Sequence, residues 1–275
     1  MLFCFILRID VPESLYARPP VPLLFAEGPH ALMQFTSLFT TAPFLANAPR
    51  GDGHTIIALP GFGGSDRSTL ILRNYLQTLN YDARPWGLGR NLGPRMAELP
   101  GRLSQMFESA YEAGGNRKVS LIGWSLGGVY ARLLAQFYPN EVRQVITMGS
   151  PFNGHPSSTR VYPVARRVMP LHQENIANLR LLAGAPLSVP NSNVYSRQDA
   201  IVPWQIATEQ VNDSTENIEV FTGHMSLGFS PAVLYALADR LNQPETDWRP
   251  FERKGWRVGV YGAADISSAR PQEVA

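Results

Sequence analysis

Three residues of this chain have the types and the chain order that acyl transfer to a serine requires: Ser125, Asp199 and His224. A serine hydroxyl is a weak nucleophile until a base takes its proton. An imidazole does this near neutral pH, and a carboxylate holds the imidazole in the required tautomer. The order Ser, Asp, His is one of the few in which this chemistry occurs. The sequence therefore suggests a Ser-His-Asp acyl-enzyme mechanism.

The serine lies in a Gly-Trp-Ser-Leu-Gly pentapeptide at 123–127. The apolar, β-branched run 118–122 before it predicts a strand, and 128–137 after it has apolar residues at helical spacing. Ser125 would then stand on a strand-to-helix turn, where the dipole of the helix favours a developing negative charge. The alternative is that Ser125 is only the N-cap of that helix.

The acid and the base are each expected just after a strand. Asp199 follows the predicted strand 194–197, and His224 follows the predicted strand 217–221. Ligands of open α/β sheets bind at these carboxyl ends. Asp199 has a structural alternative as the residue that closes an Asx-turn. Its nearest rivals as the acid are Glu219, within a strand, and Asp213, in a polar loop.

Four other histidines compete with His224 as the base: His30, His54, His155 and His172. His30 lies in a Pro-rich segment, and His54 opens a strand, where a structural histidine is expected. The other two precede the acid in the chain, against the order that the mechanism shows.

A glycine-rich turn, Pro60–Ser65, follows the apolar strand predicted at 55–59. Glycines let the backbone approach a substrate oxygen, and the N–H groups of Phe62 and Leu126 are the expected oxyanion donors, each contributing about 3–4 kcal/mol. The alternative is an ordinary turn into a helix capped by Ser65 or Asp66. Residues next to these groups are expected to line the substrate pocket, although each has an alternative place in the core: Gly61, Trp124, Phe152 and Met225.

These motifs resemble the α/β-hydrolase superfamily, and within it the bacterial esterase and lipase group, over residues 54–240. The matching stretches are 59–63 (LPGFG), 123–128 (GWSLGG), 147–152 (TMGSPF), 196–203 (SRQDAIVP) and 223–224 (GH). The resemblance implies an α/β fold with a mostly parallel central sheet flanked by helices. It also implies a carboxylic ester as the small-molecule substrate and no metal or organic cofactor.

The order of predicted elements agrees with one α/β domain at 54–275, preceded by an N-terminal extension, 1–53, packed on it. Beyond the strands above, we expect a strand at 83–86 and another at 141–148. Helices are expected at 31–44, 66–79, 95–111 and 230–241.

Residues 151–190 form an insertion between two strands, with arginines and apolar residues mixed. This pattern predicts one or two amphipathic helices that cover the active site as a short lid. The alternative is a surface excursion that covers only the edge of the sheet. Since the insertion is short, we expect a pocket for short to medium acyl chains.

Composition excludes other classes of function. The 275 residues carry 24 basic and 22 acidic side chains, so a net charge of +2 offers no excess for binding nucleic acid. One cysteine, Cys4, fits a reducing compartment, and no apolar run is long enough to span a membrane. We expect a cytoplasmic protein, with the apolar residues 1–7 leaving peripheral membrane association open. The alternatives are an acyltransferase with the same acyl-enzyme, or a non-catalytic binding protein.

Overall fold

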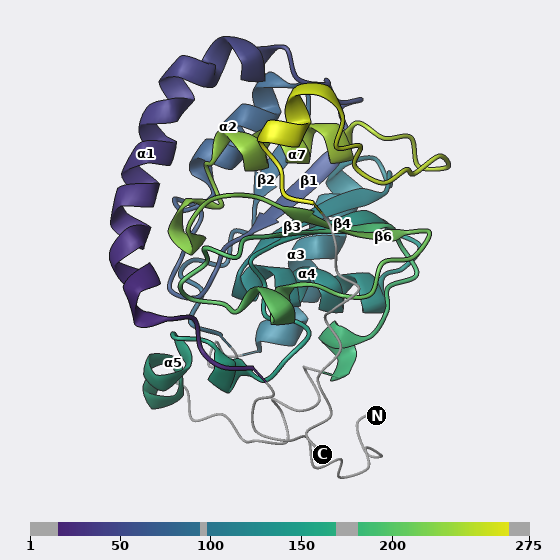
Figure 1. Ribbon diagram of the computed structural model, residues 1–275. Helices are drawn as coiled ribbons and strands as arrows, with labels where there is room; N and C mark the ends of the chain where they lie inside the picture. The colour runs from purple at the N-terminus through teal and green to yellow at the C-terminus, as the bar shows by residue number, and fades with distance from the viewer. Residues whose placement is uncertain (1–15, 94–97, 169–180, 264–275) are drawn as a thin grey trace.

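The computed structural model describes residues 16–93, 98–168 and 181–263. Six strands form a single sheet in the order β2-β1-β3-β4-β5-β6, and every neighbouring pair is parallel (Figure 1). The strands are β1 (Thr55–Leu59), β2 (Asp82–Pro85), β3 (Val119–Trp124), β4 (Val142–Met148), β5 (Asn191–Tyr195) and β6 (Thr215–Glu219). Because all strands run the same way, their carboxyl ends meet at one edge of the sheet.

Helices cover both faces of the sheet. They are α1 (Val21–Ala46), α2 (Leu70–Thr78), α3 (Leu99–Ala113), α4 (Leu126–Phe137), α5 (Tyr162–Val168) and α7 (Pro231–Leu241). Short 3₁₀ turns are η2 (Pro156–Ser158), η3 (Trp204–Ala207), η4 (His224–Ser226) and η5 (Gly255–Gly259). Buried residues of α2 and α7 form one core cluster with the sheet, and those of α3 and α4 form a second. Alternate residues of β1 divide between them, Ile56 to the first and Ile57 to the second.

The predicted α/β fold with a parallel sheet is confirmed, and the differences lie at the ends of strands and helices. The strands expected at 194–197 and 217–221 begin and end earlier, as β5 (Asn191–Tyr195) and β6 (Thr215–Glu219). The helix expected at 31–44 is longer and begins at Val21. Pro22 fits its first turn, because the backbone N–H groups there have no partner within the helix. Helix α2 begins at Leu70, since 66–69 form turns, and no side chain caps it. Cys4 and the apolar residues 1–7 lie outside the described residues.

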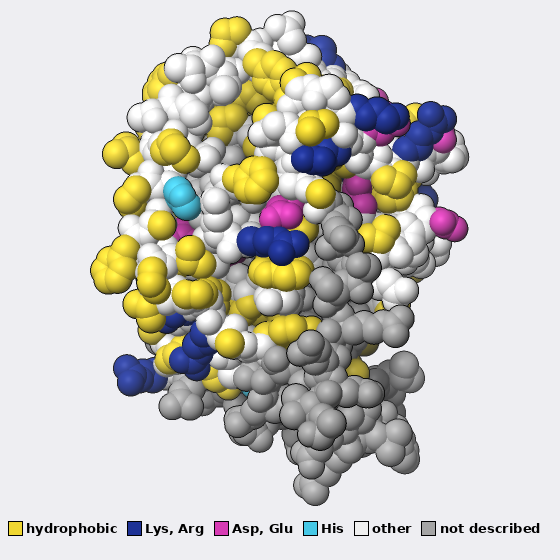
Figure 2. Space-filling view, in the orientation of Figure 1, with side chains coloured by type: hydrophobic (Ala, Val, Ile, Leu, Met, Phe, Trp, Pro, Cys, Tyr) yellow, Lys and Arg dark blue, Asp and Glu magenta, His cyan; other side chains and the backbone are white. Residues whose placement is uncertain are grey.

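Helix α1 runs along one side of the molecule, against α7 and η4 (Figure 1). Its outer side is apolar: Phe25, Leu32 and Phe39 are 80%, 66% and 72% exposed, and hydrophobic side chains line this edge of the surface (Figure 2). Across the part of the chain that the structure describes, no helix is both long and apolar enough to cross a membrane.

The insertion between β4 and β5 contributes η2 and α5 to the described residues. Residues 169–180 lie outside them. The chain is described again from Leu181, with one helical turn before β5. A lid over the active site therefore stays a prediction.

Candidate active site

Ser125 occupies a sharp turn between β3 and α4. Its φ of 54° and ψ of −122° are a strained conformation for a residue with a side chain. Two glycines make the turn possible: a Cβ on Gly123 would overlap the backbone of Gly128, and a Cβ on Gly127 would overlap the carbonyl of Leu59. The spacing of glycines in the motif thus reflects close packing of strand on helix, with the serine at the carboxyl end of β3.

Asp199 and His224 are hydrogen bonded to each other, with 2.6 Å between Asp199 Oδ2 and His224 Nδ1. Both are buried, at 3% and 5% exposed. The other oxygen of Asp199 accepts hydrogen bonds from the N–H groups of Ile201 and Val202, at 2.8 and 2.7 Å. The carboxylate is therefore held by its own loop and directs one oxygen at the imidazole. This is the arrangement that orients a histidine base.

Two contacts bring Ser125 to the same edge of the sheet as this pair. The indole N–H of Trp124, the residue before the serine, donates to the His224 carbonyl at 3.2 Å. The N–H of Ser125 donates to the carbonyl of Met148 at 2.8 Å, and the next residue, Gly149, lies against the pair. A Cβ on Gly149 would stand 2.9 Å from Asp199 Oδ2 and 3.1 Å from His224 Nδ1. Among the described residues, no hydrogen bond joins the Ser125 hydroxyl to His224.

The surroundings of His224 raise its pKa above the ordinary 6.5. Burial alone would lower the pKa, because it disfavours the charged ring. The charge and the hydrogen bond of Asp199, with a further contribution from the charge of Glu27, outweigh that effect. The site therefore favours the imidazolium that forms when the ring takes a proton.

The glycine-rich turn after β1 runs directly beside the serine. A Cβ on Gly61 would stand 3.0 Å from the Cβ of Ser125. Within the described residues, the N–H groups of Phe62 and Leu126 donate to no acceptor, so both are available to an oxygen bound near Ser125. Buried Asn91 holds the turn, donating from its side chain to the Pro60 carbonyl at 2.8 Å. Its backbone N–H also donates to the Gly64 carbonyl at 2.7 Å.

The residues predicted to line a pocket have different surroundings. Trp124 is 8% exposed and holds the His224 loop, whereas Met225 is 53% exposed. Phe152 is 1% exposed and packs in the core, with the Arg132 guanidinium 4.1 Å from its ring centre. These contacts favour structural roles for Trp124 and Phe152 and leave Met225 and Gly61 as the candidates for contact with substrate.

The rival acids lie elsewhere. Glu219 binds Arg197, with 3.0 Å between Oε1 and Nε, and accepts a hydrogen bond from the Tyr195 hydroxyl. Asp213 is exposed in a turn. Neither contacts a histidine among the described residues.

Of the rival histidines, His54 lies at the amino end of the sheet. Its Nδ1 is 2.5 Å from Asp52 Oδ1, and its Nε2 is 2.8 Å from Ser120 Oγ. Burial, and then the charge of Arg143, lower the pKa of His54 below 6.5, against the opposite effect of Asp52. The ring of His155 is bonded to the Ser157 hydroxyl within the insertion, His30 lies on α1, and His172 is outside the described residues.

Sequence reasoning missed three residues around the site: Glu27, Asn91 and Gly149. Glu27 had a signal, since it is the only Asp, Glu, Lys or Arg between Arg18 and Arg50. A lone charge in an apolar helix must either face water or be buried with partners. Gly149 lies in the stretch 147–152 that carries the family resemblance but was given no role in the site, and Asn91 had no comparable signal in the sequence.

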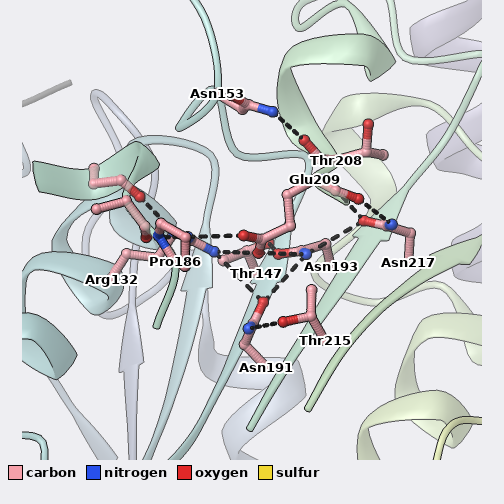
Figure 3. Close-up of polar contacts among 12 residues, drawn as sticks. Arg132, Thr147, Asn153, Pro186, Asn191, Asn193, Thr208, Glu209, Thr215 and Asn217 are labelled. Atoms are coloured by element: carbon pink, nitrogen blue, oxygen red, sulfur yellow. Dashed lines mark hydrogen bonds and ion pairs between the residues drawn. The ribbon is translucent and has the colours of Figure 1, made fainter. Parts of the chain in front are cut away.

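A buried polar network lies where the end of the insertion leads into β5 (Figure 3). Its centre is Arg132 of α4, fully buried, with 2.6 Å between its Nη1 and Glu209 Oε1. Arg132 also donates to the backbone carbonyls of Ala183 and Ala185, the latter at 2.9 Å. Side chains of β4, β5 and β6 complete the network: Thr147, Asn191, Asn193, Thr215 and Asn217. The elbow helix thus anchors the end of the insertion.

A parallel sheet with a serine on a strand-to-helix turn, and an Asp–His pair at the same edge, defines the class of α/β proteins with a nucleophile elbow. The family described as the alpha/beta hydrolase fold matches residues 30–181, more than half of the chain. This chain belongs to that family.

Similar proteins include one from mouse (Mus musculus) named Serine hydrolase BPHL, 30% identical over 134 residues. That match covers 43% of this chain and 43% of the mouse protein, so the chain spans less than half the length of this relative. A structure reported for LipS and LipT, two metagenome-derived lipolytic enzymes, is 14% identical, with 66% of this chain and 89% of that chain covered and a TM-score of 0.50. A putative aryl esterase from Burkholderia cenocepacia is 17% identical, with 70% and 91% covered and a TM-score of 0.46. At these identities the solved structures share the fold alone.

Proposed function

We propose that this protein is a serine hydrolase that cleaves carboxylic esters through an acyl-enzyme. The observation that carries the proposal is the buried Asp199–His224 pair, 2.6 Å apart, at the sheet edge where Ser125 takes its left-handed turn. Family membership supports it, and so does the name of the mouse relative, a serine hydrolase.

In the proposed reaction, the Ser125 oxygen attacks the acyl carbon while His224 takes the hydroxyl proton. Asp199 stabilises the imidazolium, and the raised pKa of His224 favours that charged form. The ring then gives the proton to the leaving alcohol as the ester bond breaks. Water attacks the acyl-enzyme, its proton passes to His224, and the acid leaves as Ser125 recovers its proton.

We assign the oxyanion to the N–H groups of Phe62 and Leu126. Both are free of acceptors among the described residues, and the Gly61 backbone lies beside Ser125. Such donors stabilise the charge that develops in the transition state, and losing one typically costs about 10²–10³ in kcat. Asn91 would keep the loop in place before substrate arrives.

The most direct test is labelling with a fluorophosphonate, followed by peptide mapping. We expect one modified peptide, labelled at Ser125, and no labelling of the Ser125→Ala variant. A folded wild-type protein that stays unlabelled would instead support a non-catalytic binding protein. Labelling at a different serine would mean that Ser125 is not the nucleophile.

The substrate class is expected to be esters with short to medium acyl chains, because the insertion after Pro151 is short. Each buried CH₂ contributes about 0.8 kcal/mol only while the pocket has room for it. A p-nitrophenyl ester series should therefore show kcat/KM rising and then falling with chain length. A maximum beyond about twelve carbons, with activation at an oil–water surface, would contradict this expectation.

A further inference from the structure

Glu27 of helix α1 places its carboxylate between the loops that carry Asp199 and His224. The backbone N–H groups of Ala200 and His224 donate to its Oε1, at 3.0 and 2.8 Å. That of Met225 donates to its Oε2 at 2.9 Å. Glu27 is 7% exposed. One buried carboxylate from a distant part of the chain thus holds the backbone of both loops.

The histidine loop is shaped to receive this carboxylate. A Cβ on Gly223 would stand 2.5 Å from Glu27 Oε2 and 2.9 Å from its Cδ, so any larger residue there would displace the side chain. All three donors are backbone N–H groups, and hydrogen bonds to a charged acceptor are stronger than neutral ones. Glu27 and the two catalytic loops therefore hold each other in position.

We propose that Glu27 is a positioning residue for the catalytic pair, which makes the N-terminal helix part of the active site; this rests on the proposed function. Asp199 and His224 follow different strands, β5 and β6, so their hydrogen bond depends on how far apart the two loops stand. The N–H groups of Ile201 and Val202 hold Asp199 only within its own loop. The Thr222 N–H donates to Ser196 Oγ at 3.4 Å, nearer the ends of the two strands. Glu27 adds a charged link between the two loops at the catalytic residues themselves.

Glu27 also adds a second negative charge beside the imidazole, in addition to Asp199. Its charge contributes to the raised pKa of His224. Removing that charge should weaken the stabilisation of the imidazolium and lower the pKa of the ring. A role in packing alone would not move this titration.

The variant that tests the proposal is Glu27→Gln. The amide keeps the shape of the side chain, but its NH₂ group cannot accept from the backbone N–H that faces it. We expect kcat on a p-nitrophenyl ester to fall by about 10- to 100-fold, the size of effect seen when the hydrogen-bond partners of metal ligands are removed in other enzymes. KM should change far less, and the acid limb of the pH profile should move to lower pH. Fluorophosphonate titration counts the active sites, so kcat refers to folded protein only.

Two further variants separate positioning from packing. Gln34→Ala is the matched control, because Gln34 lies two turns further along α1 and accepts a hydrogen bond from the Ser230 hydroxyl, away from the catalytic loops. It should keep the wild-type kcat and pH profile. Glu27→Asp keeps the charge but draws it back by one methylene, so kcat should fall while the acid limb moves less than in Glu27→Gln.

An NMR titration of the His224 ring provides a readout that does not need turnover. We expect a lower ring pKa in Glu27→Gln than in wild type. If wild type hydrolyses no ester and Ser125 is unlabelled, the proposed function fails, while a lowered ring pKa still supports the link between Glu27 and His224. If Glu27→Gln matches Gln34→Ala in kcat, in pH profile and in ring pKa, the inference about Glu27 is overturned.

Discussion

Two Asp–His–Ser groups lie at opposite ends of strand β3: Asp52, His54 and Ser120 at its beginning, and Asp199, His224 and Ser125 at its end. The first group has the shorter contacts, and both of its hydrogen bonds are formed: Asp52 to His54 at 2.5 Å and His54 to Ser120 at 2.8 Å. In the second, only the Asp–His bond is formed among the described residues. The more complete set of hydrogen bonds therefore belongs to the group that we do not propose as catalytic.

The backbone and the surroundings distinguish the two groups. Ser120 is within a strand and 0% exposed, so no substrate carbon can reach its hydroxyl. Ser125 stands on a strained turn beside available N–H donors, 8% exposed. Charge differs as well. The His54 ring contacts the cation of Arg143 in addition to the Asp52 carboxylate, whereas His224 contacts two carboxylates, Asp199 at its ring and Glu27 at its backbone N–H. The two rings consequently have pKa shifts of opposite direction.

The comparison teaches that residue types and distances do not by themselves define a catalytic triad. Access to the nucleophile, donors for the oxyanion and the sign of the charge around the base must also be present. Each of these differences leads to a test in which matched residues of the two groups are changed.

The largest expected effect comes from the serines. Ser125→Ala should lower kcat on a short ester by about 10⁴-fold or more without unfolding the protein, because triad members act as a unit. Ser120→Ala removes the hydroxyl at the other end of β3 and should leave kcat within about threefold of wild type. Steady-state kinetics with active-site titration measures both. Activity within tenfold of wild type in Ser125→Ala would contradict the assignment.

Replacing the acids of the two groups should change kcat to nearly as different an extent. Asp199→Asn is expected to cost about 10⁴ in kcat, since the amide favours the wrong tautomer of His224. Asp52→Asn should leave kcat unchanged and lower the melting temperature, because it weakens contacts of a buried ring and of Arg143. If Glu219→Gln or Asp213→Asn lowers kcat more than Asp199→Asn does, the acid is misassigned.

The pH profile should show a smaller but diagnostic effect. Activity requires neutral His224, so kcat/KM should rise with pH through a single ionisation above the ordinary 6.5. Replacing His54 or His155 by Ala should leave that ionisation in place, whereas His224→Ala should abolish it together with the activity. A profile that collapses in His155→Ala would move the base into the insertion.

The smallest effect concerns stability. The folded pKa of His54 is below its unfolded value, so its contribution to stability is complete above about pH 6.5 and is lost as pH falls below it. His224 has the opposite shift, so its contribution is present below about pH 6.5 and is lost as pH rises through the folded pKa.

His54→Gln should flatten the decline of the melting temperature on the acid side, and His224→Gln should flatten the decline on the alkaline side. A change of 1 kcal/mol corresponds to about 2–4 °C, which thermal unfolding between pH 5 and 8 resolves. If the melting temperature changes with pH in the same way in both variants and in wild type, the opposite directions of the two histidine pKa shifts are refuted.

The sequence allowed the parallel sheet to be predicted from local strand patterns. It allowed the Asp199–His224 pair to be predicted because each residue follows a strand and the strands of a parallel sheet end at the same edge. The strand before Ser125 and the helix after it can be recognised from periodicity within about ten residues on each side. The order of the acid and the base followed from the chain order in which such triads occur.

The supports of the site could not be predicted, because they depend on contacts between distant segments. Glu27 meets Ala200 and His224 across more than 170 residues of sequence. Asn91 holds a turn thirty residues earlier through a side chain whose type is common in loops. Phe152 flanks the motif in sequence, yet packing directs its ring under Arg132 and into the core. Such roles are specified by tertiary structure, which no single segment contains.

The position of Glu27 has a consequence for anyone who shortens or fuses this protein. The family match begins at residue 30, and the first strand of the sheet begins at Thr55. A chain cut at either point keeps Ser125, Asp199 and His224, and it still removes the carboxylate that joins two of their loops. The smallest unit to express is therefore set by one glutamate rather than by the boundary of the recognisable domain, and a fusion partner should be attached ahead of α1 without straining it.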